Sequence, residues 1–452
     1  MIFHLNLNFS LKDNVPLNSI FQKVQFIRNH VPPSGLFKDK EWRVSPFSFV
    51  LEERYVEILN RLGIYLQKFY EAADLLYRLS VRGKQPSFVY ELLDRGKPRE
   101  LIEISRSEKL KNDLPRVIRP DLILTEEGFA LCELDSVPGG IGLTAWLQET
   151  YGQWGESLIG GREGMKQGFK AIFPEGVVVV SEEAMTYWPE FEYLVGLERM
   201  RHAESYTFDC EPVYRFFECF DWEKLSTLRK SYSPDRCSIT PPLKPYLEEK
   251  LLLAFFWLKS LTDFWKRYLS EKGMQFLRKL IPYTWVVDPT PLPYNAVIPG
   301  LEVQSWKEVG AFSQSQRELV LKVSGFSPLA WGSRGVYIGS DMSSSEWQEK
   351  LAMALADFPH HPWIMQRFVR GKLIKHPYVE GQKMEEMIGR TRISPYYFVY
   401  DSQVHLCGVL VTICPADKKI IHGMKEAILV PGALAKPEER KKEEWNEVLE
   451  VR

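Results

Sequence analysis

An apolar stretch with charged residues at alternate positions constrains this chain more than any other feature. It covers residues 119–142 and is divided by Glu126-Glu127-Gly128. These three residues suit a hairpin loop, because glycine readily adopts the left-handed conformation that such a loop needs. We predict that Thr125 pairs with Phe129 across the loop, which would fix the register of two antiparallel strands.

That register predicts a charged face on the hairpin. Asp121 would lie opposite Glu133 and Arg119 opposite Asp135, because directly paired residues share a face. Three carboxylates beside one arginine repel one another unless a cation joins them, and Mg²⁺ prefers carboxylate oxygens. The pattern therefore predicts a metal–nucleotide site with Asp121, Glu133 and Asp135 as ligands. The alternative is a set of solvated charges on an edge hairpin.

Composition narrows the class of protein. A length of 452 residues allows two or three domains, and 45% hydrophobic with 26% charged residues is typical of a soluble globular protein. The formal net charge of -1 argues against a general nucleic-acid or membrane-surface binder. The six cysteines form no C-x-x-C pair, and no leader or bilayer-length apolar run is recognisable. We therefore expect a cytoplasmic protein.

The pattern along the chain predicts an α+β fold in three segments. Residues 1–112 contain apolar residues at helical spacing, so we expect an N-terminal helical region. Residues 113–288 hold the hairpin and a buried strand at Val177–Val180, which is followed by a helical pattern over residues 182–201. A proline-rich connection then leads into residues 289–452, which are rich in strand patterns and end in a charged tail.

A lysine and a glycine-rich loop in the last segment predict phosphate binding. Lys322 interrupts an apolar strand, and the segment that follows, residues 324–339, is rich in glycine. A lysine at this place would contact phosphate oxygens, and the backbone amides around Gly332, Ser333 and Gly335 could cover them. The alternative for the lysine is an ordinary surface charge.

A pair of arginines would complete the phosphate contacts. Arg390 and Arg392 are two residues apart at the start of a strand pattern, and guanidinium groups suit phosphate oxygens. The alternative for each is a surface charge. No P-loop or dinucleotide-binding glycine motif occurs in the sequence. We interpret His422 as a structural histidine, because no nucleophile or acid lies at a recognisable spacing from it.

Taken together, these motifs resemble a circularly permuted ATP-grasp ligase of the glutathionylspermidine synthase type. The resemblance covers residues 113–432 and rests on Arg119-x-Asp121, Glu133-x-Asp135, Pro138, the Lys322 loop and the Gln366 strand. Arg215 and Glu248-Glu249-Lys250 look like the pre-ATP-grasp portion of that family. The chain departs from the family at Asp135, where asparagine is usual, and at residues 136–140.

The resemblance implies an ATP- and Mg²⁺-dependent ligase that joins a small-molecule carboxylate to an amine through an acyl phosphate. It assigns Asp121, Glu133 and Asp135 to Mg²⁺, Arg119 to the acyl phosphate, Lys322 and Arg392 to the ATP phosphates, and Gln366 and the backbone through Phe368 to adenine. The alternatives are a phosphotransferase that uses the same site and an inactive nucleotide-binding scaffold. Nucleic-acid and membrane partners are not expected.

Overall fold

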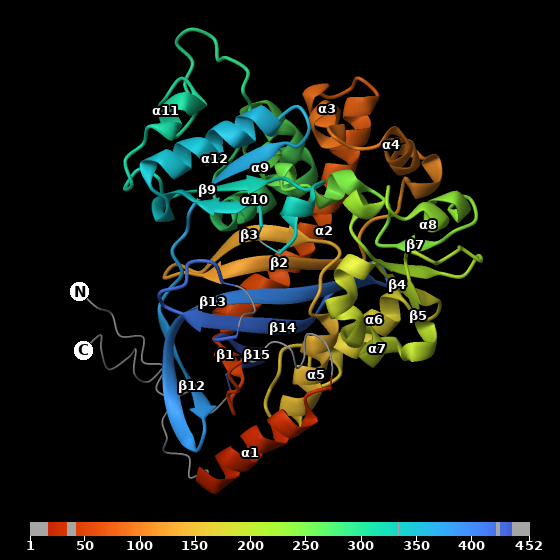
Figure 1. The fold of residues 1–452 in the computed structure, drawn as a ribbon, viewed down its shortest axis with the longest axis vertical. Coiled ribbons are helices and arrows are strands. Elements are labelled where there is room, and N and C mark those ends of the chain that lie inside the picture. Colours follow the sequence, from red (N-terminus) through yellow and green to blue (C-terminus); the bar gives the residue numbers. More distant parts are fainter. Residues whose placement is uncertain (1–16, 34–41, 333, 422–424, 436–452) are drawn as a thin grey trace.

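The computed structural model describes residues 17–33, 42–332, 334–421 and 425–435. It confirms the predicted mixed α+β fold, with helices packed around three sheets (Figure 1). Ser333 and His422 lie outside the described residues. Within the described part of the chain, no helix combines the length and the apolar character needed to cross a bilayer.

The largest sheet has seven strands in the order β1-β15-β14-β13-β2-β3, and β12 pairs with β13. Its strands are β1 (Phe49–Leu51), β2 (Val117–Leu124), β3 (Phe129–Asp135), β12 (Ile374–Glu380), β13 (Lys383–Tyr400), β14 (Gln403–Pro415) and β15 (Ile428–Leu434). It therefore takes strands from all three predicted segments. The boundaries at residues 112 and 288 stay predictions.

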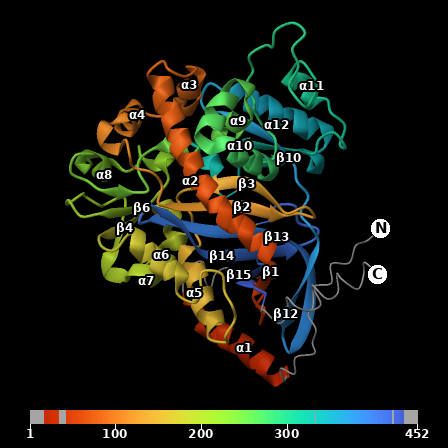
Figure 2. The same cartoon turned by 180° about the vertical axis from the view of Figure 1, so that it is seen from behind.

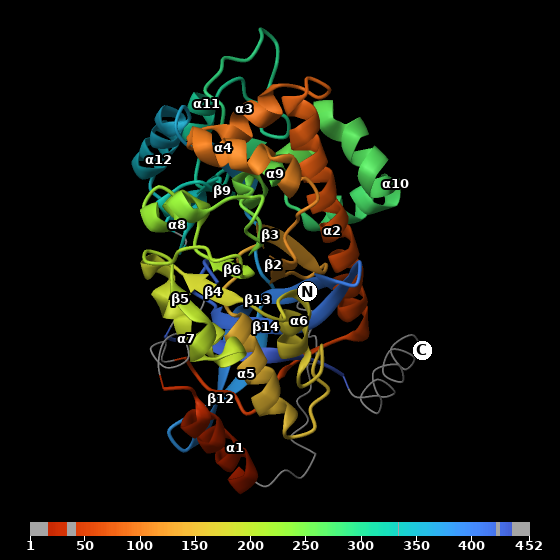
Figure 3. The ribbon, with the colours of Figure 1, turned by 90° about the vertical axis from the view of Figure 1, so that its right-hand side faces the viewer.

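Helices cover both faces of this sheet (Figures 2 and 3). Helix α2 (Glu53–Val81) crosses one face, where the hydroxyl of Tyr397 donates to the carbonyl of Leu59 at 2.6 Å. Helices α5 (Ile141–Gly152) and α6 (Gly164–Ile172) pack on the other face, α5 against β14 and β15 and α6 against β13 and β14. Burial on both faces explains why β13 and β14 carry long runs of buried residues.

A four-stranded antiparallel sheet lies above the hairpin in Figure 1, in the order β10-β9-β11-β8. Its strands are β8 (Thr284–Val286), β9 (Leu319–Val323), β10 (Val336–Ile338) and β11 (Trp363–Arg367). A separate apolar core, which includes Trp347 of helix α12 (Ser344–Asp357), packs against it.

A third sheet of four short parallel strands contains the predicted strand Val177–Val180. The order is β5-β4-β6-β7, with β4 (Val177–Val180), β5 (Met200–His202), β6 (Val213–Phe216) and β7 (Ile239–Thr240). The predicted helix over residues 182–201 is broken into 3-10 turns and the short helix α7 (Trp188–Val195). Gly196, with φ of 85°, ends α7, because glycine adopts this conformation without a steric penalty.

The remaining helices complete the layers around the three sheets. They are α1 (Leu17–His30), α3 (Phe88–Asp94), α4 (Arg99–Arg106), α8 (Ser226–Ser231), α9 (Leu251–Trp257), α10 (Thr262–Leu280) and α11 (Trp306–Gly310).

Candidate active site

The register of the β2–β3 hairpin places its charged residues as predicted. Asp121 pairs with Glu133 and Arg119 pairs with Asp135. The predicted turn was wrong, because Leu124 and not Thr125 lies opposite Phe129. The loop is therefore one residue longer than predicted, and a bulge in β3 between the two paired regions restores the register.

Asp121 is the most heavily bonded carboxylate of the hairpin. It lies 3.2 Å from Arg119 and 3.3 Å from Arg392, and Ser394 Oγ donates to it at 2.9 Å. Burial alone would raise the pKa of Asp121, but the charges of Arg119 and Arg392 outweigh burial and lower it. Ser394 was missed in the sequence, although it follows Arg392 by two residues and so shares its face of β13.

The other two hairpin carboxylates also contact bases. Glu133 pairs with Lys250 at 2.8 Å, and Asp135 pairs with Arg119 at 3.1 Å. Burial raises the pKa of Asp135 despite the nearby Arg119. Burial acts against the charged form of Lys250, but the charge of Glu133 outweighs it and raises the pKa of Lys250. The sequence indicated Lys250 only through the family resemblance, because its partner lies far away along the chain.

Lys322 reaches the hairpin from the four-stranded sheet. Its Nζ donates to the carbonyl of Cys132 at 3.0 Å and to Oε1 of Gln366 at 2.8 Å. Burial lowers the pKa of Lys322, and the charge of Glu133 partly offsets that effect. The structure therefore brings Lys322, Gln366 and the charged face of the hairpin together.

Two other predicted nucleotide-binding residues, Arg390 for phosphate and Phe368 for adenine, have hydrogen-bond partners away from the charged face of the hairpin. Arg390 donates to the carbonyls of Gly371 and Ala416, and no ion pair joins it to the hairpin carboxylates in the described residues. The backbone N–H of Phe368 donates to the carbonyl of Glu318 at 3.0 Å, so this amide already has an acceptor.

The glycine loop lies beside β9. Gly332 has φ of 62° and open space around it. Gly335 N–H donates to the carbonyl of Leu329 at 2.7 Å, so this amide is engaged within the loop.

The carboxylates of the hairpin have the right chemistry for Mg²⁺, because they are hard oxygen donors. However, the described residues contain no group of three or more Asp, Glu, His or Cys side chains arranged to hold a metal ion. Each of Asp121, Glu133 and Asp135 contacts a cationic side chain instead. The three carboxylates are therefore suitable Mg²⁺ ligands by chemistry, but in this structure they do not converge on a common position.

A second cluster of charges lies next to the hairpin at the ends of two parallel strands. Arg215 is fully buried, pairs with Glu248 and also donates to the carbonyl of Phe217 at 2.7 Å. Burial, followed by the charges of Glu248 and Asp135, raises the pKa of Glu218 to about 8. Sequence reasoning missed Glu218, because β6, the strand before it, was not predicted; an acidic residue just after a parallel strand is otherwise a usable signal of a ligand site.

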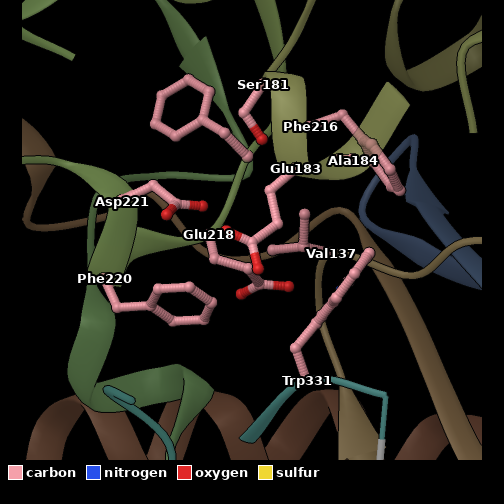
Figure 4. A pocket seen from close by; sticks show the side chains of 10 residues that line it. Val137, Ser181, Glu183, Ala184, Phe216, Glu218, Phe220, Asp221 and Trp331 are labelled. Carbon is pink, nitrogen blue, oxygen red and sulfur yellow. The ribbon is translucent and has the colours of Figure 1, made fainter. Parts of the chain in front are cut away.

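A pocket opens beside Glu218 (Figure 4). Its wall includes Ser181 after β4, Glu218 and Asp221 after β6, Val137 after the hairpin and Trp331 from the glycine loop. The pocket therefore borders the hairpin, the parallel sheet and the glycine loop.

Comparison with known proteins identifies the fold of the chain. No protein-family model matches the chain, and no curated protein does. The solved structure of a glutathione synthetase-like effector from Globodera pallida, in its apo form, matches at a TM-score of 0.51 and 10% identity. The match covers 93% of this chain and 97% of that one. The chain therefore has a glutathione synthetase-like fold.

A weaker match is a proposed gamma-glutamylcysteine synthetase from Methylobacillus flagellatus. It has a TM-score of 0.35 and 12% identity, over 77% of this chain and 84% of that one. A likeness at that TM-score supports no conclusion about fold or function.

Proposed function

We propose that this chain is an ATP- and Mg²⁺-dependent ligase that joins a carboxylate to an amine through an acyl phosphate. In this proposal the fold is a circularly permuted ATP-grasp fold with a pre-ATP-grasp layer. The fold likeness to a glutathione synthetase-like protein supports the proposal, because that name describes an amide-forming enzyme class.

The observation that carries the proposal is the position of Lys322. A buried ammonium group, bonded only to neutral oxygens among the described residues, faces a hairpin that carries Asp121 and Glu133. A desolvated cation without an ion-pair partner is costly to maintain. A phosphate oxygen would give this cation the anionic partner that it lacks.

Each predicted residue then has a role in the reaction. Lys322 and Arg392 would hold the phosphates of ATP, and Arg119 would stabilise charge on the acyl phosphate. Asp121, Glu133 and Asp135 would hold Mg²⁺, which lowers the negative charge on the transferring phosphoryl group. For Glu133 to serve, it must leave Lys250, so Lys250 would be free to contact the nucleotide.

One observation favours a second candidate, an inactive nucleotide-binding scaffold. Asp121, Glu133 and Asp135 each contact a basic side chain, and no metal-holding group is found in the described parts of the chain. A protein in which these pairs never open would bind a nucleotide without turnover.

Thermal denaturation with ATP and Mg²⁺ tests the binding step. We expect ATP plus Mg²⁺ to raise the melting temperature of the wild type by mass action, and Asp121→Asn and Glu133→Gln to lose most of that rise. Glu127→Gln is the matched control, because Glu127 is an exposed carboxylate in the hairpin loop. No rise in the wild type, or an equal rise in all variants, would exclude the assigned site.

A hydroxylamine trap tests the chemical step. An acyl phosphate reacts with hydroxylamine to give a hydroxamate, so ATP, Mg²⁺ and a panel of amino-acid and short-peptide carboxylates should yield hydroxamate and ADP in matching amounts. ADP release without hydroxamate supports a phosphotransferase. ATP binding with no ADP release supports the scaffold.

A further inference from the structure

The connection between β8 and α11 projects from one end of the molecule (Figures 1 and 3). It contains the proline-rich stretch of the sequence, with prolines at positions 289, 291, 293 and 299. Its base is packed, because Ile298 is buried and the indole N–H of Trp285 donates to the carbonyl of Pro299 at 2.8 Å. Every residue from 289 to 295 is exposed, so this part of the connection is available to a partner.

The spacing of the prolines restricts the backbone of this stretch. Proline has φ of about -65° and disfavours the helical conformation in the residue before it. Each residue from 288 to 293 is therefore either a proline or restricted by the proline that follows it. The N–H of Thr290 donates to the carboxylate of Asp288 at 2.8 Å, and neither a turn nor a bend occurs from residue 291 to 293. These residues favour the polyproline II conformation.

A tight turn places a tyrosine at the tip of the connection. The N–H of Ala296 donates to the carbonyl of Pro293 at 2.9 Å, and Asn295 has φ of 71°. Positive φ at the third residue of a turn but not at the second is typical of a type II turn, whose second residue has a backbone close to polyproline II. Tyr294 occupies that second position, so the extended stretch continues to residue 294.

The exposed side chains of this stretch are largely apolar. Tyr294 is 94% exposed and Leu292 is 41% exposed. Polyproline II repeats every three residues, so Pro291 and Tyr294 lie on one edge of it. Residues 289–301 include no charged side chain. A simple connection needs no aromatic side chain at its tip, whereas tyrosine is enriched among the residues that carry binding energy at protein interfaces.

Such a segment fits a groove that is lined by aromatic side chains. Protein domains of the SH3, WW and EVH1 kinds bind proline-rich polyproline II segments in grooves of this type. A segment that its own prolines restrict loses little conformational entropy when it binds. A nucleic acid would require basic side chains, and residues 289–301 have none.

We infer that residues 291–294 are a docking segment for a protein domain with an aromatic-lined groove that binds polyproline II, with Pro291 and Tyr294 as the principal contacts. This inference does not depend on the proposed ligase activity. The segment projects away from β2 and β3 (Figure 1), so we expect docking to leave the candidate nucleotide site unchanged.

NMR titration of an isotope-labelled WW domain with the full chain tests the docking segment. We expect the indole signal of the groove tryptophan to shift with the wild-type chain, and Tyr294→Ala and Pro291→Ala each to weaken binding at least about tenfold. Tyr268→Ala is the matched control, because Tyr268 is an exposed tyrosine on α10, outside the connection. The melting temperature and its rise with ATP and Mg²⁺ should be the same in the wild type and all three variants, since the altered side chains are exposed.

Four outcomes would overturn the inference. The first two are no shift of the indole signal, and equal binding by the wild type and Tyr294→Ala. The third is equal binding by a WW domain in which alanine replaces the groove tryptophan, because aromatic stacking would then contribute nothing. The fourth is a dimer in sedimentation velocity that Tyr294→Ala dissociates, because the segment would then join two copies of this chain.

The ATP-dependent rise in melting temperature separates docking from the nucleotide site. If Tyr294→Ala loses that rise, the segment belongs to the nucleotide site and the inference falls. If the wild type shows no rise but binds the WW domain through Tyr294, the docking segment stands and the proposed function falls.

Discussion

At the scale of single residues, the charges on and around the β2–β3 hairpin are paired with opposite charges, except for that of Lys322. Arg119 is shared by Asp121 and Asp135, and Glu133 has Lys250. Lys322 is bonded only to neutral groups among the described residues, which are the carbonyl of Cys132 and the amide of Gln366. Removing an ion-paired residue would leave a buried charge behind, whereas removing Lys322 would not.

Lys322→Met separates ligand binding from stability. We expect the affinity for ATP with Mg²⁺ to fall at least about tenfold, because the ammonium contact to phosphate is lost. The free energy of unfolding should change by less than about 2 kcal/mol, because only neutral partners lose a hydrogen bond. Calorimetric titration and urea unfolding measure the two quantities.

Lys375→Met is the control for this change, because Lys375 is 65% exposed and lies on β12, outside the site. Unchanged ATP affinity in Lys322→Met would contradict the phosphate role of Lys322.

The sequence could predict which hairpin residues face each other, because alternation along a strand fixes the faces once the register is known. It could not predict the bulge in β3. A three-residue loop without a bulge and a four-residue loop with a bulge both place Asp121 opposite Glu133, and no local sequence pattern distinguishes them. It also could not predict Lys250 or Glu218 as neighbours of the hairpin. Their proximity depends on how distant elements pack.

At the scale of elements, the turn from β3 into α5 depends on one glycine. Gly140 precedes α5 with φ of 87°, and a Cβ at this position would lie 2.4 Å from the hydroxyl of Tyr396. That hydroxyl donates to the carbonyl of Gly139 at 2.8 Å, so it is held in place. The glycine run alone indicates a turn, and the close approach of Tyr396 explains why the turn requires glycine.

Gly140→Ala should lower the free energy of unfolding more than an alanine substitution at a glycine that has a positive φ but open space around it. Gly83 has φ of 69° and no atom within 4 Å of the place where a Cβ would lie, so Gly83→Ala should cost about 1 kcal/mol. Gly140→Ala should cost about 2 kcal/mol more, because Tyr396 must also move. Equal losses in the free energy of urea unfolding for the two variants would show that the contact with Tyr396 adds nothing to the cost of Gly140→Ala.

The edge strand β12 carries a buried histidine that should make stability depend on pH. His376 is 1% exposed and its Nε2 lies 3.0 Å from Ser45 Oγ. Burial lowers the pKa of His376 to about 4, whereas an unfolded histidine has a pKa of about 6.5. Below pH 6.5 the unfolded chain therefore binds a proton that the folded chain does not bind until pH 4.

The free energy of unfolding should therefore be unaffected by His376 above pH 6.5. As the pH drops from 6.5 toward 4, protonation of the unfolded chain should lower it by on the order of 3 kcal/mol. His376→Gln should remove this loss, so its free energy of unfolding should fall less than that of the wild type between pH 6.5 and 4. Urea unfolding at several pH values measures the difference. Parallel curves for the two proteins would contradict the assignment.

At the scale of the whole molecule, a buried network joins elements from all three predicted segments. Lys97 follows α3, Glu249 precedes α9, and Ser324 follows β9. Glu249 pairs with Lys97 and accepts from Ser324, and the side chains of Lys97 and Glu249 are fully buried. The sequence indicates the strand around Lys322, but a contact between residues 97, 249 and 324 has no local signal.

The same network positions the glycine loop. The backbone N–H of Phe326 donates to Glu249 at 3.3 Å, and a Cβ on Gly325 would lie 2.8 Å from the carboxyl group of Glu249. The start of the loop is therefore packed directly on Glu249, so this carboxylate couples the stability of the interior to the position of the loop.

Lys97→Met should destabilise the whole molecule, by about 3 kcal/mol or more, because Glu249 keeps a buried charge without its ion-pair partner. Glu249→Gln should also destabilise, because it leaves Lys97 uncompensated. The double variant should lose less than the sum of the two single variants, since neither charge is then left alone.

Urea unfolding of the four proteins gives the coupling free energy, and hydrogen exchange should show faster exchange in residues 324–332 in both single variants. Additive losses would mean that the two side chains contribute independently, and exchange confined to the neighbourhood of α3 would mean that Glu249 does not position the loop.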